Sequence, residues 1–383
     1  MEKLYEENPY LTRFTAAVEL CRPGEGGWEV ILDRTAFYPE GGGQPWDLGR
    51  LGGAEVTRVR LLGDRVVHTC SAPLEPGTRT EGEIDWPRRF DLMQNHSGEH
   101  IVSGIAHEKW GCENVGFHMG AETVAIDFDR ALAWEQLAVL EEAANRYIWE
   151  DRPVSVRFPE GEELERTAYR SKKALTGRVR IVSFPGADVC ACCGTHVSSA
   201  GQVGLVKLLS LQKLRGGVRI ELVCGGRALK YLSGVWEQNR QVSNLLSAKP
   251  LETGAAAERL LEENAGLKER AARLEQEQFE GLAGRYAGAG DVVLFQEGLT
   301  PGGLRRLCAA VLERCGGRCA CFSGADGAGW QYAVGEKGGD LRPLAKELNR
   351  ALEGRGGGKP DFVQGAVRAG RREIEAFFAA FGG

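Results

Sequence analysis

A chain of 383 residues is long enough to form two or three domains. Its hydrophobic content of 43% and charged content of 26% are typical of a folded globular protein and exclude a disordered one. The net charge of −5 argues against a broad nucleic-acid-binding surface, so any such contact requires basic residues that are clustered locally.

Signals for export or membrane insertion are absent from the sequence. No apolar run reaches the roughly 18 residues that a membrane-spanning helix needs, and the start, MEKLYEENPY, lacks the basic and apolar parts of a secretory signal. We therefore expect a cytoplasmic protein with no membrane partner. In that reducing compartment, the eleven cysteines favour metal binding or burial over a disulfide framework.

The N-terminal residues 1–88 have the pattern of a small β-domain. Short, partly alternating apolar segments are separated by glycine-rich breaks, at residues 14–20, 28–33, 54–61 and 64–70. Period-2 alternation of this kind is typical of strands with one buried face. The segment therefore predicts a β-barrel or a β-sandwich.

From about Phe90 the pattern changes to a mixture of helices and strands. Residues 90–108 and 133–150 carry apolar side chains at helical spacing. Strands are expected at residues 154–158, 179–184, 203–211 and 217–225. The block of residues 89–227 is therefore predicted to be an α+β domain.

A long helical segment is predicted for residues 228–283. Within it, positions alternate by four and three, as in a coiled-coil seam with a polar residue that fixes the register; they are Leu260, Asn264, Leu267, Ala271, Leu274 and Gln278. About three heptads are marginal for a stable coiled coil. An antiparallel hairpin within one chain and a homodimer through this seam both remain open.

The last block, residues 284–383, alternates expected strands and helices, which predicts an α/β domain. Strands are expected at residues 291–296 and 319–324, and helices at 304–315 and 341–353. A glycine-rich loop, GRGGGKP, and a final helix at residues 371–381 close the chain.

His96 and His100 lie four residues apart in a predicted helix, which puts both imidazoles on one face. Such a pair alone is a weak metal signal. The segment DVCACCGTHV strengthens it, because Cys192 and His196 are again four apart, next to Gly194, which permits a tight turn. Three of the chain's six histidines fall in these two motifs.

Two imidazoles, a thiolate and a third imidazole form a suitable tetrahedral set for zinc (Zn2+). Cys192 has the spacing that matches the first pair. The neighbouring Cys190 and Cys193 are interpreted as small buried hydrophobic residues, and His68 as a structural residue.

Here the sequence resembles a known family. HSGEH followed by CCGTH resembles the HxxxH and CxxxH zinc motifs of the alanyl-tRNA synthetase editing domain, and TAFYPEGGGQPWDLG and GGVRIELVCG resemble the segments on either side. The block around GRGGGKPDFVQGA is similar to the glycine-rich C-terminal domain of those synthetases. The order of the motifs resembles that of long-form AlaX proteins. One residue departs from the usual Cys-Gly-Gly-Thr-His pattern, since Cys193 replaces the first glycine.

The resemblance implies an overall α+β fold with four segments. They are a β-barrel (1–88), a zinc-binding editing domain (89–227), a helical coiled-coil segment (228–283) and a C-terminal tRNA-binding domain (284–383). Because no aminoacylation domain precedes the barrel motifs, we expect no amino-acid activation.

The activity that the resemblance implies is hydrolysis of the aminoacyl ester of mischarged alanine tRNA, Ser-tRNA(Ala) or Gly-tRNA(Ala). To hydrolyse the serine ester and spare the alanine ester, the site must form hydrogen bonds with the serine hydroxyl. Alanine has no hydroxyl, so these polar groups of the site would have no partner when alanine is bound. The segments that match the family make Thr35 and Gln44 the candidates. Glu99, between the two helical histidines, is a candidate for orienting a water molecule or a metal ligand.

Basic residues that could meet tRNA phosphates cluster in two places. One is the acid-free stretch of residues 166–180, which also holds Arg166 and Arg180 and in which we expect contacts from Arg170, Lys172, Lys173 and Arg178. The other is the C-terminal glycine loop, in which backbone N–H groups approach phosphate closely. Its expected contacts are Arg355, Gly356, Gly357, Gly358 and Lys359.

The sequence has two alternatives to an editing function. A zinc-stabilised tRNA-binding protein without hydrolytic activity is the main alternative, because four protein ligands are typical of a structural zinc site. A DHH-type phosphoesterase is rejected, since the sequence has no aspartate-rich DHH run.

Overall fold

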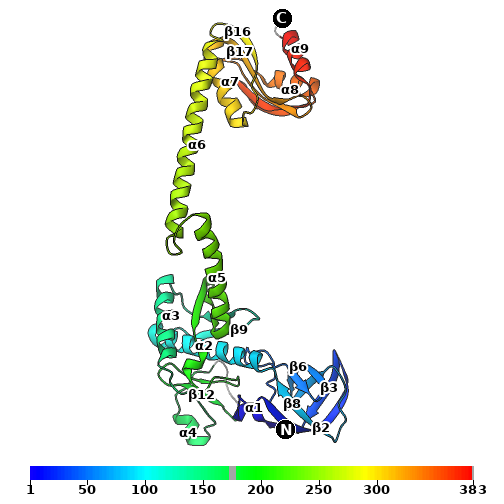
Figure 1. Cartoon of the computed structure of the whole chain (residues 1–383), viewed down its shortest axis with the longest axis vertical. Helices are drawn as coiled ribbons and strands as arrows, with labels where there is room; N and C mark the ends of the chain where they lie inside the picture. Colours follow the sequence, from blue (N-terminus) through cyan, green and yellow to red (C-terminus); the bar gives the residue numbers. More distant parts are fainter. Residues whose placement is uncertain (172–177, 382–383) are drawn as a thin grey trace. The chain divides into compact units, whose positions relative to one another are not determined.

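The computed structural model describes residues 1–171 and 178–381 of the chain (Figure 1). They divide into two compact units, Met1–Gln241 and Val242–Gly383. Both units combine helices and sheets, which confirms the predicted mixed α+β class. The finer division into four segments stays a prediction. None of the described helices combines the length and the apolar character needed to span a membrane.

The first unit begins with a closed barrel whose strand order is β2-β3-β7-β6-β5-β8. Its strands are β2 (Arg13–Gly24), β3 (Gly27–Leu32), β5 (Gly49–Leu51), β6 (Ala54–Leu62), β7 (Arg65–Cys70) and β8 (Arg79–Ile84). Buried aromatic and branched side chains, among them Phe14, Leu32 and Phe37, fill its interior. We did not predict β8 from the sequence, because its inward positions are Thr80, Gly82 and Ile84 and only the last is large and apolar.

A helix of 25 residues, α2 (Trp86–Trp110), follows the barrel directly. It starts earlier than predicted because Asp85 caps it by accepting a hydrogen bond from the Arg88 backbone N–H, and Pro87 is suited to a first turn. Gly111 ends it in the left-handed region at φ 62°. The helix is buried continuously from Asn95 to Ala106.

A buried ion pair fixes α2 to the barrel. Arg89 and Asp47 pair with side chains that are each only 1% exposed, and Arg89 also donates to the carbonyl oxygens of Ala36 (2.6 Å) and Pro9 (2.7 Å). Removing one partner of such a pair leaves an uncompensated buried charge. The direction in which α2 leaves the barrel is therefore tightly determined.

The rest of the first unit consists of further sheets and helices. Its sheets have the orders β14-β15-β10-β9, β11-β12-β13 and β1-β4. Their strands are β9 (Asn114–Met119), β10 (Val124–Phe128), β14 (Val206–Leu214), β15 (Gly217–Cys224), β11 (Ser155–Arg157), β12 (Ile181–Phe184), β13 (Asp188–Ala191), β1 (Glu2–Lys3) and β4 (Arg34–Thr35). The short helices are α1 (Leu4–Glu7), α4 (Gly161–Arg166) and η1 (Ala200–Val203). Helix α3 (Trp134–Trp149) packs against α2 around Leu137, Leu140 and Ala144.

The long helix predicted for residues 228–283 is in fact two helices, α5 (Gly225–Leu245) and α6 (Thr253–Gly284). Pro250 lies in the break, where its ring is incompatible with a continuous helix. The seam residues all fall on α6, and Leu260, Leu267 and Leu274 are about half exposed. The seam is thus left open, and pairing with a second chain stays a prediction.

The second unit is built on a five-stranded sheet of order β16-β17-β18-β20-β19. The strands are β16 (Gly290–Phe295), β17 (Gly316–Ala325), β18 (Gly329–Gly335), β19 (Arg355–Lys359) and β20 (Phe362–Val367), and the helices are α7 (Pro301–Cys315), α8 (Arg342–Ala351) and α9 (Arg371–Phe381). The end of α6 packs against α7 through Phe279 and Ala283. Cys308, Cys319 and Cys321 are fully buried in this core, and their sulfur atoms lie within 4.8 Å of one another.

The glycine-rich segment that we predicted to be a loop is strand β19. It pairs antiparallel with β20 over five positions, with Gly356 opposite Gly365. A run of glycines lacks the side-chain pattern that identifies a strand in the sequence. The glycines are needed here for close approach, since a Cβ on Gly356 would lie 2.3 Å from the Tyr332 hydroxyl oxygen.

We therefore expect Gly356→Val to lower the unfolding free energy of the second unit by about 1–3 kcal/mol, because the side chain forces the sheet and Tyr332 apart. Chemical denaturation of the full chain measures this change. Gly357→Ala is the control, since a Cβ there meets nothing within 4 Å. Equal stability of the two variants would contradict the packing described for β19.

Candidate metal centre and active site

Four predicted metal ligands converge in the first unit. His96 and His100 come from α2, and Cys192 and His196 from the loop after β13. Their candidate ligand atoms all lie within 4.8 Å of one another. The Cys192 Sγ is 3.5 Å from His96 Nε2 and 3.3 Å from His196 Nε2. The structure therefore brings together the set that the spacing predicted.

The orientation of each imidazole is fixed through its other nitrogen. The Nδ1 atoms of the three histidines each have a polar side-chain partner: Gln44 Oε1 for His96 (2.8 Å), Asp188 Oδ2 for His100 (2.7 Å) and Ser97 Oγ for His196 (3.4 Å). Partners of this kind fix the tautomer and leave Nε2 as the metal-binding atom. Sequence reasoning missed Asp188 and Ser97, because nothing in their local pattern marks a contact so distant along the chain.

The donor set fits a metal ion on an observation of its own. His100 Nε2 is buried and has no hydrogen-bond partner among the residues that the structure describes. A buried polar atom without a partner is costly. A cation among the four side chains would satisfy this nitrogen and draw the other three ligand atoms to one point.

The electrostatics of the site favour a thiolate at Cys192. Burial alone would raise the pKa of this thiol, but electrostatic interaction with His96 and hydrogen bonds from His100 and His196 hold it well below its usual range. Burial also lowers the pKa of His196 well below its ordinary value, so its imidazole is neutral. These are the forms of the two groups that bind metal ions. For His100, burial lowers the pKa, but the Glu99 charge and the Asp188 hydrogen bond raise it well above its usual value, so this imidazole must lose a proton to bind a metal ion.

The carboxylate behind His100 is held in its ionised form. Burial would raise the pKa of Asp188, but hydrogen bonds from His100 and Arg170 bring it below its usual value. Arg170 donates through Nε to Asp188 Oδ1 at 2.8 Å and through Nη2 to Oδ2 at 2.9 Å. Arg170, predicted to contact tRNA, thus lies with its side chain 17% exposed behind a candidate metal ligand.

Gly194 and Gln44 shape the loop that carries Cys192 and His196. A Cβ on Gly194 would lie 2.2 Å from His96 Cε1, so close approach to this ring requires the glycine, rather than the tight turn that we predicted. Gln44 Oε1 also accepts from the Thr195 backbone N–H (3.1 Å), and its Nε2 donates to Thr195 Oγ1 (2.9 Å). The amide of Gln44 therefore ties the loop to His96.

Arg180 holds the same loop through backbone hydrogen bonds. Its Nη1 donates to the carbonyl oxygens of Cys192 and Gly194, both at 2.8 Å. Only 8% of the residue is exposed. The expectation that it belongs to an exposed phosphate-binding stretch is therefore wrong, because the guanidinium is committed to the interior.

Glu99 is a buried carboxylate beside the metal ligands. Its Oε1 accepts from Ser103 Oγ at 2.8 Å and from Asn114 Nδ2. Its Oε2 is 3.9 Å from His100 Nε2. One oxygen is therefore anchored and the other faces the site, which supports the candidate role that the sequence assigned to Glu99.

A cavity of about 510 Å³ opens next to the cluster. Metal ligands form part of its wall, together with Gly42, Gly43, Glu99, Phe117 and Arg170. Its size is that of ordinary small-ligand sites. Gln44 and Thr35 are not among the described residues that line it, so their direct contact with a substrate stays a prediction.

Thr35 lies in the barrel core, fully buried. Its Oγ1 is 2.8 Å from His68 Nε2 and accepts from the Phe37 backbone N–H at 3.1 Å. His68 Nδ1 lies 3.1 Å from the Val30 carbonyl oxygen. The structural role expected for His68 is consistent with these contacts, and they place Thr35 in the same packing.

Two neighbouring cysteines differ in their surroundings. Cys190 is buried, as expected, but Cys193 is exposed, so its interpretation as a buried hydrophobic residue is wrong. Its Sγ lies 3.8 Å from the Tyr38 hydroxyl. Cys193 is outside the four-ligand group among the described residues.

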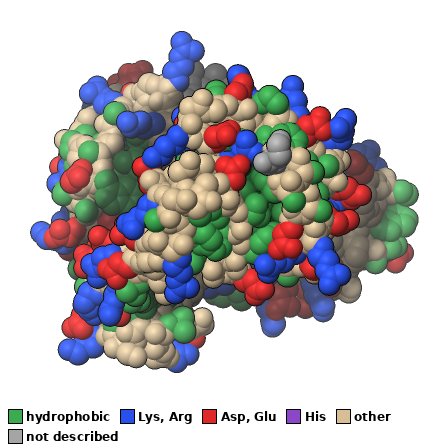
Figure 2. All heavy atoms as spheres, turned by 90° about the horizontal axis from the view of Figure 1, so that it is seen from above, with side chains coloured by type: hydrophobic (Ala, Val, Ile, Leu, Met, Phe, Trp, Pro, Cys, Tyr) green, Lys and Arg blue, Asp and Glu red, His purple; other side chains and the backbone are tan. Residues whose placement is uncertain are grey.

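The remaining predicted tRNA contacts lie in several places. Lys172 and Lys173 fall outside the described residues. Arg178 is exposed and its guanidinium carbon lies 3.8 Å above the Phe158 ring. Arg355, Gly356, Gly357, Gly358 and Lys359 are the exposed residues of β19. On the face of the molecule in Figure 2, lysine and arginine side chains are interspersed with acidic ones.

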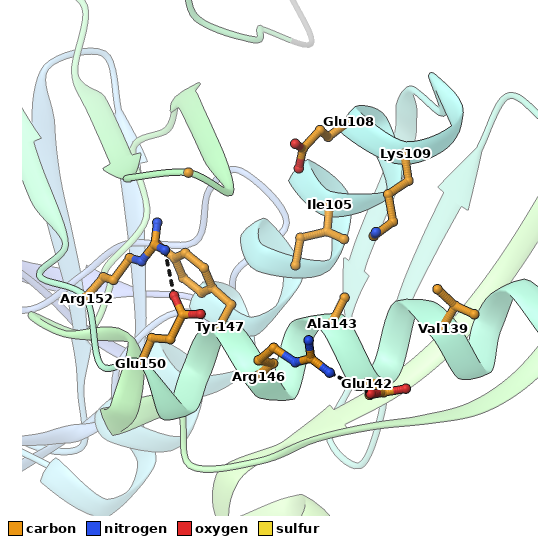
Figure 3. A pocket seen from close by; sticks show the side chains of 11 residues that line it. Ile105, Glu108, Lys109, Val139, Glu142, Ala143, Arg146, Tyr147, Glu150 and Arg152 are labelled. Carbon is orange, nitrogen blue, oxygen red and sulfur yellow. Dashed lines mark hydrogen bonds and ion pairs between the residues drawn. The ribbon is translucent and has the colours of Figure 1, made fainter.

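A second hollow, between α2 and α3, has different chemistry (Figure 3). It is lined by Ile105, Tyr147 and several charged residues. Four of these charges are paired locally, since Arg146 contacts Glu142 at 2.8 Å and Arg152 contacts Glu150 at 2.6 Å. The cavity at the histidine cluster, with its unpartnered nitrogen, is therefore the candidate active site.

Comparison with known proteins places this site in a family. The family model "Threonyl and Alanyl tRNA synthetase second additional domain" matches residues 179–221, which include Cys192 and His196. Alanyl-tRNA editing protein Aarsd1-A of Xenopus laevis is 34% identical over 268 residues, 66% of this chain and 65% of that protein. The mouse protein Aarsd1 is 32% identical over 64% of each chain.

The chain belongs to the AlaX-like alanyl-tRNA editing family. It spans just under two thirds of the length of the editing proteins that it matches. The alanine–tRNA ligase of Pyrococcus abyssi is 32% identical over 97% of this chain and 42% of the ligase. That match extends through the second unit as well as the metal cluster.

The Asp188 carboxylate gives the first test of the centre. We expect Asp188→Asn to weaken zinc binding about 10- to 100-fold, because it removes the acceptor that orients His100. Competition with a zinc chelator measures the affinity. Asp127→Asn is the matched control, since Asp127 pairs with Arg219 at 2.7 Å away from the cluster. Unchanged affinity in Asp188→Asn would refute the orienting role.

His68 gives a pH test of the barrel core. Burial lowers its pKa from 6.5 to about 4. Below pH 6.5 the unfolded chain therefore takes up a proton that the folded chain does not bind until about pH 4. We expect wild type to lose about 1.4 kcal/mol of stability per pH unit in that interval relative to His68→Gln. Parallel stability curves for the two proteins would contradict this.

Proposed function

We propose that the chain hydrolyses the aminoacyl ester of mischarged alanine tRNA, with a zinc ion held by His96, His100, Cys192 and His196. The observation that carries the proposal is the position of Glu99, whose free oxygen faces the metal ligands inside a cavity. Supporting it are the names of the relatives, which are alanyl-tRNA editing proteins and alanine–tRNA ligases.

Zinc is the ion that suits this donor set best. Three imidazole nitrogens and one thiolate are its preferred ligand types, and they can be arranged as a tetrahedron. When bound, zinc would supply a Lewis acid that polarises the ester carbonyl. The Nδ1 partners Gln44, Asp188 and Ser97 keep the three imidazoles aimed at one point and limit the motion of the centre.

Glu99 would act as the general base. Ser103 and Asn114 anchor Oε1, so Oε2 is free to accept a proton from a water molecule in the cavity. The water oxygen then forms a bond to the ester carbon, and the bond from that carbon to the 3′ oxygen of the ribose breaks. Glu99 returns the proton to the leaving oxygen, which releases the free amino acid and tRNA.

A closed ligand set supports one alternative function. Four protein ligands are typical of a structural zinc site, so a zinc-stabilised tRNA-binding protein without hydrolytic activity is the second candidate. The two functions differ at Glu99. A purely structural centre has no need of a carboxylate with one free oxygen in an open cavity.

The tRNA would be held by contacts in both units. In this proposal Arg178 in the first unit and Arg355 and Lys359 of β19 in the second meet the phosphates of mischarged tRNA(Ala). Joining two weak contacts in one chain raises the overall affinity without a new contact. The exposed seam of α6 is offered as a homodimer contact, which leaves the metal site complete within each chain.

The test is to follow ester loss from Ser-tRNA(Ala), Gly-tRNA(Ala) and Ala-tRNA(Ala) with the zinc-loaded chain. We expect the serine or glycine ester to be lost and the alanine ester to be spared. Glu99→Gln should lower kcat about 10²- to 10⁴-fold while zinc content is kept, because the base is missing.

Glu108→Gln, an exposed change on the same helix, is the control and should leave the rate unchanged. Cys192→Ala should lose both zinc and activity. If wild type binds zinc and tRNA but spares all three esters, the hydrolase proposal is wrong and the binding function replaces it.

A further inference from the structure

An apolar wall lines one side of the metal-centre cavity. Val115 and Phe117, two residues apart on β9, both face this cavity, next to the metal ligands. Val115 is 65% exposed, although it is a large hydrophobic residue in a strand. Phe117 is partly buried. The wall is therefore accessible to a ligand that enters the cavity.

A β-bulge explains why Val115 is exposed. Gly116 lies opposite Asp127 and Asn114 lies opposite Phe128, so Val115 has no residue directly across from it on β10. Bulges turn a side chain away from the regular face of the sheet, and they are frequent beside active sites. Here the bulge turns an apolar side chain toward the cavity.

Phe117 connects this wall to the metal centre. Its ring stacks on that of His96, with the centroids 5.0 Å apart and the planes at 25°. It also packs against the Gly43 backbone, where a Cβ would lie 2.4 Å from the ring. Since strand residues rise about 3.3 Å each, Val115 stands roughly 6.6 Å farther along the wall. The wall thus runs from a metal ligand outward.

We propose that Val115 and Phe117 form the binding surface for the 3′-terminal adenine of the tRNA. This inference rests on the proposed function. Serine and glycine have small side chains without a large apolar surface, the ribose is polar and the phosphates are charged, so the base is the substrate's large flat apolar group. It lies one sugar ring away from the ester. Unpaired RNA bases are bound by stacking on aromatic and apolar side chains.

Two stable analogues test the subsite directly. In the first, an amide replaces the ester of 3′-seryl-adenosine; the second is the same compound without the base. Calorimetry with the zinc-loaded full chain measures both dissociation constants. We expect wild type to bind the adenosine compound about 5- to 150-fold more tightly, the range that stacking of one base contributes.

Val115→Ser should reduce this ratio to below about threefold and leave binding of the base-free compound unchanged, because only the contact with the base is weakened. Val139→Ser, an exposed valine on α3 outside this cavity, is the matched control and should keep the wild-type ratio. Zinc content, measured for each variant, shows that the centre is intact.

Equal binding of the two compounds by wild type, or an unchanged ratio in Val115→Ser, would overturn the adenine subsite. Failure of the adenine subsite and failure of the proposed hydrolysis give different results. Ester loss with no preference for the base refutes only the subsite. A base preference without ester loss in any tRNA refutes hydrolysis and keeps the subsite.

Discussion

The geometry of the site depends on one constraint, the fixed aim of three imidazoles toward a single thiol. Each histidine is held through Nδ1, by an amide, a carboxylate or a hydroxyl, so that Nε2 faces Cys192. Within the described part of the chain, His100 Nε2 is buried without a hydrogen-bond partner, which fits a role as a metal ligand. The orienting residues, rather than the ligands alone, make the cluster a preformed site.

Several contacts elsewhere in the first unit hold the elements that carry the four ligands in position. The ion pair of Arg89 with Asp47 sets the line of α2 against the barrel, and with it the positions of both helical histidines. Arg180 holds the opposite loop by its carbonyl groups, and Gly194 lets this loop touch the His96 ring. Because both sides are largely buried, the metal centre and its surroundings form one packed structure, and a cavity opens beside Glu99.

The sequence predicted the ligands but not the residues that orient them. Spacing of four on a helix is a local property, so His96 and His100 could be paired from the sequence alone, and Cys192 and His196 by the same spacing. Asp188 and Ser97 act across the fold, and only packing shows that they meet His100 and His196. Strand β19 was not predicted, because its glycines lack the side-chain pattern of a strand. Arg180 lies in a basic stretch of the sequence, which is typical of an exposed surface, although its side chain is buried. Long-range contacts account for these errors.

The most direct test is a zinc-edge X-ray absorption spectrum of the purified full chain. The account predicts one sulfur ligand at about 2.3 Å and nitrogen ligands at about 2.0–2.1 Å in a ratio of one to three. Substitution of Cys192 should remove the sulfur signal. A spectrum with two or more sulfur ligands, or a folded chain that binds no zinc, would contradict the centre on which the proposed chemistry depends.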